Sequence, residues 1–166
     1  MTSKFKSRLP YVVLVFAVIG LDRWTKWLVQ TRLVLNQTIP IIDAFFNITY
    51  VRNTGVAFGI LDSVSLPLKS TVLAVLTLVA ITGVLVYSWR TPANQTLLQA
   101  ALSLILAGAL GNLYDRVLYG YVIDFIEVYY RTYRWPSFNV ADSAITVGVG
   151  LLVLQIFRKD THDTAG

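Results

Sequence analysis

The amino-acid sequence predicts an all-α membrane protein with four transmembrane helices, a small extracytoplasmic β-sheet and an interfacial loop. Two observations lead to this fold class. The 166 residues are 55% hydrophobic and only 14% charged, whereas about 25% of a soluble domain is usually charged. The apolar residues also gather into four runs, and each run is close to the ~20 residues that span a bilayer as a helix. These runs are residues 10–29, 66–89, 97–114 and 140–157.

The distribution of cations orients the predicted helices. Three cations, Lys4, Lys6 and Arg8, precede the first run, and Arg158 and Lys159 follow the last. Because cations favour the cytoplasmic side and four spans return the chain to its starting side, we expect both termini to be cytoplasmic. No small-x-small cleavage site precedes Asp22, so the first run is interpreted as a retained helix rather than a cleaved signal peptide. Since there is no internal repeat or linker, we expect residues 1–166 to form one domain.

This topology places the connecting segments on two sides. The short link 90–96 is expected on the cytoplasmic side, and segments 30–65 and 115–139 are expected on the extracytoplasmic side. Segment 115–139 contains three tyrosines and a tryptophan between 129 and 135. Such aromatic residues suit the membrane interface, so we expect an interfacial loop there.

A short stretch of segment 30–65 has the composition of a β-strand. Residues 46–51, Phe-Asn-Ile-Thr-Tyr-Val, are rich in β-branched and aromatic residues, and the next four, 52–55, form a turn signal. Residues 56–60 could return as a second strand. We therefore expect a small sheet that lies on the membrane.

The composition excludes several kinds of chemistry. The chain has no cysteine, which excludes disulfides, thiolate metal sites and cysteine nucleophiles. Its one histidine, His162, lies in a polar tail, which argues against a His-based triad or a zinc protease site. The net charge of +5 comes from scattered cations, which suit lipid headgroups better than nucleic acid. We therefore expect no metal, no cofactor and no nucleic acid, and membrane lipid as a partner.

Polar residues at the ends of the predicted helices need an explanation. Asp22 and Lys26 are four residues apart near the end of the first run, and this spacing predicts an ion pair on one helix face. Asn112, Asp115 and Arg116 share one face at the end of the third run, and Arg116 is within reach of Asp115 as a partner.

Two further acids follow. Asp124 lies in an apolar stretch after the third run. Asn139 is the predicted N-cap of the last helix, with Asp142 at the third helical position, in the pattern of a capping box. The topology gathers all these residues at one membrane face, where ionisable groups are candidates for function. Two neighbouring carboxyls cannot both ionise, so one can act as an acid and the other as a base. Asp142 is one candidate, but spacing alone leaves Asp115 and Asp124 open as the second acid.

At these residues the sequence resembles bacterial lipoprotein signal peptidase (signal peptidase II), a family of membrane aspartyl peptidases. The resemblance covers nearly the whole chain. It is carried by five blocks in order: Asp22 with Lys26, then residues 52–58, 108–116, 122–125 and 138–143.

The resemblance implies an endopeptidase that removes signal peptides from diacylglyceryl-modified prolipoproteins and cleaves before the lipidated cysteine. It implies a multi-pass protein of the bacterial inner membrane with its active site at the extracytoplasmic face, and we expect it to act as a monomer. The family's catalytic dyad falls on Asp124 and Asp142. Because Asp142 lies in the first turn of a helix, where the dipole favours an anion, we expect it to be the base and Asp124 to hold the proton. The supporting positions are Asn53, Asn112, Asp115, Arg116 and Asn139, and the pair Asp22–Lys26 matches a structural position.

Three alternatives remain open at this point. Ser65 and Lys69 are spaced for a Ser–Lys peptidase. Asp115, Asp124 and Asp142 could form the relay of a small proton-coupled transporter. The polar cluster could also be the interface of a structural assembly protein.

Overall fold

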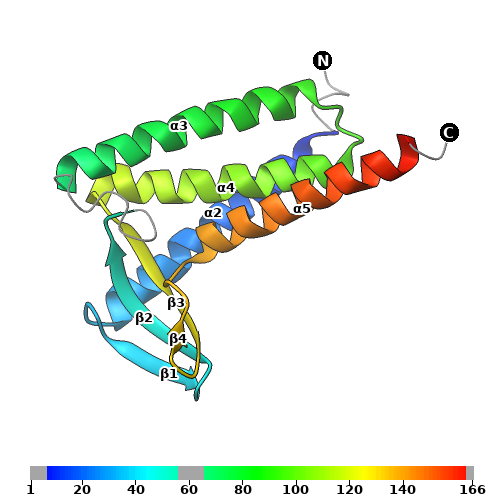
Figure 1. The fold of residues 1–166 in the computed structure, drawn as a ribbon. Helices are drawn as coiled ribbons and strands as arrows, with labels where there is room; N and C mark the ends of the chain where they lie inside the picture. The colour runs from blue at the N-terminus through cyan, green and yellow to red at the C-terminus, as the bar shows by residue number, and fades with distance from the viewer. Residues whose placement is uncertain (1–6, 56–65, 164–166) are drawn as a thin grey trace.

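The computed structural model describes residues 7–55 and 66–163, with side chains described for 7–55 and 68–157. The described part is mostly helical, with a small antiparallel sheet (Figure 1). Its helices are α2 (Leu9–Arg32), α3 (Leu66–Arg90), α4 (Thr96–Tyr119) and α5 (Val140–Asp163). Its strands are β1 (Thr38–Ile42), β2 (Phe46–Asn53), β3 (Val122–Tyr130) and β4 (Tyr133–Arg134).

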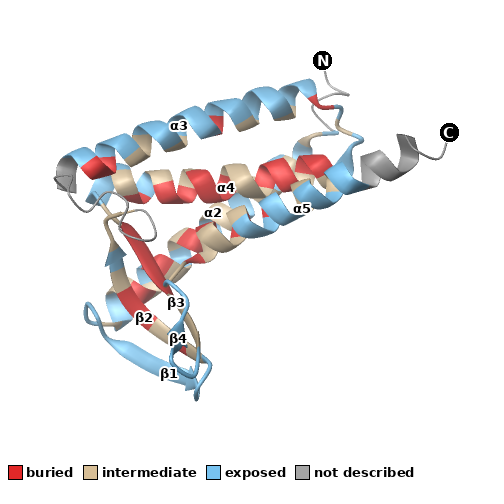
Figure 2. Cartoon of the chain, in the orientation of Figure 1, coloured by how far each residue is buried: buried red, intermediate tan, exposed pale blue. Residues whose placement is uncertain are grey.

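Helix α4 is the central element of the bundle and contacts α2, α3 and α5 (Figure 1). Figure 2 shows the buried residues concentrated along α4, whereas α3 is mostly exposed. Glycines let α5 approach α4 closely, because a Cβ at Gly108 would overlap the backbone carbonyl of Ala141. At the other contact a Cβ at Gly148 would lie 2.8 Å from the carbonyl oxygen of Ala101. Close backbone contact through small residues is typical of helix packing in membranes.

Three of the described helices are long and apolar enough to cross a membrane: Leu68–Arg90, Thr96–Tyr119 and Val140–Phe157. They correspond to the second, third and fourth predicted runs. The first predicted run forms α2, which is 24 residues long but is not among these candidates. Its charged residues Asp22, Arg23 and Lys26 explain the difference, because they lower its hydropathy.

The two ends of the bundle differ. We call the end where α2 and α4 end, and where α3 and α5 begin, the sheet end, because the strands extend sideways from it (Figure 1). At the far end, the side chain of Arg8 donates to the backbone carbonyls of Ser88 and Thr91 at 3.0 and 2.8 Å. The start of α2 is therefore fixed to the link between α3 and α4.

The strands form one sheet with the order β1-β2-β3-β4, in which each neighbouring pair is antiparallel. The prediction of a strand at residues 46–51 is confirmed by β2, while residues 56–60 lie outside the described residues. The sheet is larger than predicted, because β1, β3 and β4 were not expected. Strand β3 pairs with β2, and in that register Val51 lies opposite Asp124.

The prediction of an interfacial loop over 115–139 was wrong. Helix α4 continues to Tyr119, and Gly120 ends it in the left-handed conformation with φ 77°. Only Gly adopts that conformation without strain. The following residues pair with β2, about 70 positions earlier in the chain. That long-range pairing, rather than a local signal, makes the segment a strand.

Candidate active site

Four charged side chains form a buried cluster between α2 and α4 at the sheet end. The Nζ atom of Lys26 lies 3.0 Å from Asp22 and 2.7 Å from Asp115. The guanidinium of Arg23 contacts the same two carboxylates at 2.6 and 2.5 Å. Asp22, Lys26 and Asp115 are almost completely buried, and Arg23 stacks on the ring of Tyr114. With two cations and two anions, the cluster has no net charge.

The predicted ion pair between Asp22 and Lys26 is confirmed, and the predicted pairing of Asp115 with Arg116 was wrong. Asp115 binds Lys26 and Arg23 instead. Neighbouring positions on a helix point about 100° apart, so Arg116 projects away from the face that Asp115 presents to α2.

Arg23 is the member of this cluster that the sequence analysis missed. It is adjacent to Asp22 in the sequence, whereas the helix spacing rule indicates partners only at positions three or four residues apart. The usable signal was a third charge, Arg23, within an otherwise apolar run, because a charge in a membrane-spanning helix requires a partner in the bundle.

This four-charge cluster also binds two backbone amides. The N–H of Ala141 donates to Asp22 at 3.0 Å, and the N–H of Ile123 donates to Asp115 at 3.3 Å. Ala141 precedes Asp142 in α5, and Ile123 precedes Asp124 in β3. The cluster therefore holds the two chain segments that carry the other two aspartates.

Asp124 is held by two asparagine side chains. It is 2% exposed and lies in β3. The amide of Asn53 donates to its Oδ2 at 2.9 Å, and the amide of Asn139 donates to its Oδ1 at 2.8 Å. The carbonyl oxygen of the Asn53 side chain accepts from the N–H of Gly55 at 3.0 Å. This turn fixes Asn53 with its NH₂ group directed at Asp124.

Asp142 is held by a third asparagine and by the start of its own helix. The amide of Asn112 donates to its Oδ1 at 2.7 Å, and the backbone N–H of Asn139 donates to its Oδ2 at 3.2 Å. In return, the side chain of Asn139 accepts from the N–H of Asp142 at 2.9 Å. The predicted capping box is confirmed.

Asn139 connects the two acids, because it binds Asp124 through its side chain and Asp142 through its backbone N–H. Asn112 connects them to the charged cluster, since its oxygen accepts from Lys26 and from Asn139, each at 3.3 Å. Five predicted residues thus meet in one hydrogen-bonded network: Asn53, Asn112, Asp124, Asn139 and Asp142.

The two pairs of acids differ in their partners. Among the described residues, Asp22 and Asp115 each contact two cations, whereas Asp124 and Asp142 have amide donors and no ion pair. Burial, together with the negative charge of Asp142, raises the pKa of Asp124 to about 7, although the hydrogen bonds from Asn53 and Asn139 act in the opposite direction. A carboxyl with such a pKa can hold a proton at neutral pH beside an ionised neighbour.

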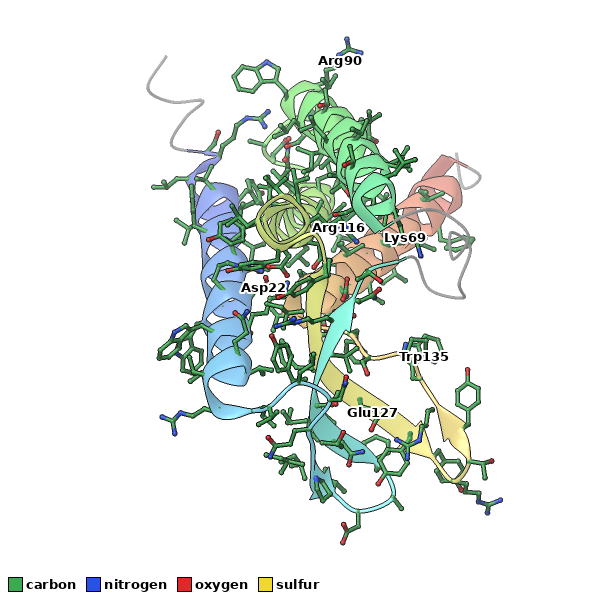
Figure 3. All side chains as sticks on the ribbon, turned by 90° about the vertical axis from the view of Figure 1, so that its left-hand side faces the viewer. Asp22, Lys69, Arg90, Arg116, Glu127 and Trp135 are labelled. Atoms are coloured by element: carbon green, nitrogen blue, oxygen red, sulfur yellow. The ribbon has the colours of Figure 1, made fainter. Side chains whose placement is uncertain are left out.

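Arg116 lies on α4, one turn after Asn112, within electrostatic range of Asp142 and Asp124. Figure 3 looks onto the sheet end of the helices, where Arg116 of α4 and Lys69 of α3 lie. In the part of the chain that the structure describes, the Arg116 guanidinium has no hydrogen bond or ion pair. It is half-buried.

The remaining predictions concern residues at the edge of this site. Ser65 lies outside the described residues, so its pairing with Lys69 stays a prediction. Lys69 is buried at the start of α3, and a Cβ at Gly55 would lie 3.5 Å from its Nζ atom. Within residues 7–55 and 68–157, whose side chains the structure describes, no three Asp or Glu side chains come close enough to hold a metal ion.

Comparisons with known proteins identify the family of the chain. The family model described as signal peptidase (SPase) II matches residues 14–158. A lipoprotein signal peptidase of Geobacter sulfurreducens is 49% identical over 140 residues, which is 84% of this chain and 86% of the relative. One from Syntrophus aciditrophicus is 40% identical over 154 residues, 93% of this chain and 96% of the relative.

Solved structures give the same picture. One solved structure is described as a bacterial membrane enzyme obtained by the in meso method. It superposes with a TM-score of 0.83 at 33% sequence identity, and the match covers 92% of this chain and 90% of that chain. A second with the same description has a TM-score of 0.77 at 36% identity, over 89% of this chain and 92% of its own. The chain belongs to the signal peptidase II family, which is a family of aspartic peptidases.

Proposed function

We propose that Asp124 and Asp142 are the catalytic dyad with which this peptidase removes signal peptides from prolipoproteins. The observation that carries the proposal is the contrast between the acids. Asp22 and Asp115 are neutralised by cations, while Asp124, which is buried, and Asp142, which is half-buried, are joined through Asn139 and have only amide donors among the described residues. The substrate is a diacylglyceryl-modified prolipoprotein, cleaved before its lipidated cysteine. The proton-coupled transporter gains no support from the comparisons.

The two acids take different roles. Asp142 lies in the first turn of α5, where the helix dipole favours its anion. It removes a proton from water as the water oxygen attacks the scissile carbonyl carbon. Asp124, whose pKa is raised to about 7, gives its proton to the amide nitrogen as the C–N bond breaks. The proton taken up by Asp142 then passes to Asp124, which restores the ionised base and the protonated acid.

The supporting residues divide by their contacts. Asn53, Asn112 and Asn139 orient the dyad carboxyls. Arg116, which has no partner among the described side chains, binds a carbonyl oxygen of the substrate. Asp115 acts with Asp22 and Lys26 to hold the backbone.

The protein is a single membrane domain. Helix α2 also spans the membrane, so that with α3, α4 and α5 there are four spans. The charges of α2 are tolerated because Asp115 of α4 completes a neutral cluster with them. The cations near both termini favour the cytoplasm, so the sheet lies on the extracytoplasmic surface of the bacterial inner membrane. The enzyme works as a monomer, without metal or cofactor.

The test uses purified wild type, Asp124→Asn and Asp142→Asn with a diacylated precursor and an unlipidated precursor. Wild type should cleave only the diacylated one, and both variants should lose cleavage by at least about 10³-fold while still inserting into membranes, because loss of the acid or base removes the chemical step. Asp43→Asn, an exposed acid in the turn before β2, is the matched control and should retain activity. Cleavage retained by both dyad variants would refute the mechanism.

A further inference from the structure

A groove runs along the contact between α3 and α4, and its lining includes Arg116, which lies within electrostatic range of both dyad acids. Its volume is about 490 Å³, within the usual range for small-ligand sites. Helix α3 contributes one face to it, including Ser70, Ala74 and Leu78, and α4 contributes Leu113, Arg116 and Val117.

The groove has a polar end and an apolar end. Ser70 and Arg116 lie at the sheet end, where the Ser70 hydroxyl donates to the backbone carbonyl of Arg116 at 3.3 Å. From there the helical rise of 1.5 Å per residue places Ala74 about 6 Å and Leu78 about 12 Å further along α3. This distance is covered by apolar side chains, so the lining changes from polar to hydrocarbon as the groove enters the membrane-spanning part of the bundle.

The polar end adjoins the site already described. Asn112, which donates to Asp142 at 2.7 Å, and Arg116 are four residues apart on α4 and so share a face. Arg116 therefore lies between the dyad and the groove. When the reacting bond of a ligand lies at the dyad, a polar group of that ligand can contact Arg116. A thin apolar chain attached to that group can then lie between α3 and α4.

We propose that this groove is the subsite for one acyl chain of the lipid-modified substrate. The inference rests on the proposed function and adds where the lipid lies. A signal-peptide helix is ~10 Å wide and does not fit between two helices joined by the Ser70–Arg116 hydrogen bond. A single acyl chain does fit, and its ester carbonyl falls near the guanidinium of Arg116.

The groove orients the lipid-modified substrate more than it increases the binding affinity. Lipid tails are as apolar as the groove lining, so a chain gains little by leaving the bilayer for the groove. Its confinement instead fixes the glyceryl group, and with it the lipidated cysteine, relative to Asp124 and Asp142. Misplacement of a reacting bond by about 1 Å can cost up to about 10²-fold in rate.

A crosslinking experiment locates the chain. The inactive Asp124→Asn protein is incubated with a diacylated precursor that carries a diazirine in one acyl chain, irradiated and analysed by peptide mass spectrometry. We expect adducts on residues 70–78 and 113–117, reduced by excess unlabelled precursor. Adducts confined to α2 or α5, or groove adducts that unlabelled precursor does not displace, would overturn the proposal; the latter would mean that bulk lipid occupies the groove.

A substitution tests the consequence for catalysis. Ala74→Phe fills the groove midway, and Ala80→Phe adds the same ring at an exposed position of α3 outside the groove. With a dipalmitoyl precursor, Ala74→Phe should lower kcat/KM about tenfold. With a dibutyryl precursor, whose chains end before Ala74, it should change kcat/KM less than twofold, and Ala80→Phe should affect neither.

The outcomes separate the two proposals. Equal loss with both precursors, or no loss with either, would reject the acyl-chain subsite. Cleavage of the dibutyryl precursor by Ala74→Phe also shows that the dyad is intact in that variant. Cleavage retained by both dyad variants, Asp124→Asn and Asp142→Asn, would instead reject the catalytic proposal, and the crosslinks would still report where the lipid binds.

Discussion

Asp22 of α2 accepts a hydrogen bond at 3.0 Å from the backbone N–H of Ala141, the residue that precedes Asp142. Asp115 accepts the equivalent bond from Ile123, the residue that precedes Asp124. Since Lys26 and Arg23 each contact both carboxylates, the two backbone segments are tied to one neutral charged cluster. The separation of the two proposed catalytic acids therefore depends on residues that do not take part in the chemistry.

Arg23 should be essential to this arrangement. Arg23→Met leaves Lys26 as the only cation between two buried carboxylates, and the cluster acquires a net negative charge. Removing one partner of a buried ion pair costs about 3–5 kcal/mol, and because the Arg23 side chain is 24% exposed we expect a loss near the lower limit. The melting temperature in detergent should fall, together with activity. Arg90→Gln, at the far end of α3, is the control, and a wild-type melting temperature in Arg23→Met would contradict this role.

Gly108 should not tolerate a methyl group. A Cβ there would overlap the backbone carbonyl of Ala141, and backbone cannot rotate away as a side chain can. Gly108→Ala should therefore displace the start of α5, with Asp142, and lower activity at least about tenfold. Gly150→Ala meets no atom within 4 Å and should be neutral or slightly stabilising, since Ala favours helix. Comparable activity of the two variants would show that α4 and α5 do not need this close contact.

Local patterns predicted the helices and the capping box of α5 because each depends on neighbours in the sequence. The apolar runs mark the starts of α3, α4 and α5 to within one residue, although α4 and α5 continue beyond the predicted ends, and Asn139 with Asp142 is a local signal. Strand β3 was missed because its partner β2 is distant in the chain. Its aromatic residues suit an interface as well as a strand.

The sequence predicted which residues form the site better than it predicted the contacts among them. Sequence spacing identified the pair Asp22–Lys26, and it assigned Asp115 to Arg116 because they are adjacent. The actual partners of Asp115, Arg23 and Lys26, come from another helix, and no spacing rule can report that. Spacing also left Asp115 and Asp124 open as the second acid, and the family resemblance favoured Asp124. In the structure, only Asp115 of these two has cations beside it among the described residues.

The stability of the protein should depend on pH through Asp124. Burial raises its pKa from 3.8 to about 7, so the folded state binds this proton more tightly than the unfolded state. The stability that the protonated form contributes is present below about pH 4 and is lost as the pH rises to about 7, by up to ~4 kcal/mol. Melting temperatures of wild type and Asp124→Asn measured from pH 4.5 to 8.5 should therefore diverge, with wild type declining more. Parallel curves would show that Asp124 does not hold a proton in the folded state.

Asn53 should control the pH at which activity is lost in alkaline solution. If Asp124 is the acid, the rate falls once its proton leaves, so kcat should decline above about pH 7. The amide of Asn53 donates to Asp124 at 2.9 Å and favours the carboxylate, so Asn53→Ala removes a bond that lowers the pKa. The pKa of the acid should rise, and the alkaline limb should move to higher pH by about one unit, the equivalent of a charged hydrogen bond. Asn94→Ala, exposed in the link between α3 and α4, should leave the limb in place. A reduced rate in Asn53→Ala with an unmoved limb would mean that Asn53 positions the substrate or the turn and does not set the proton affinity of the dyad.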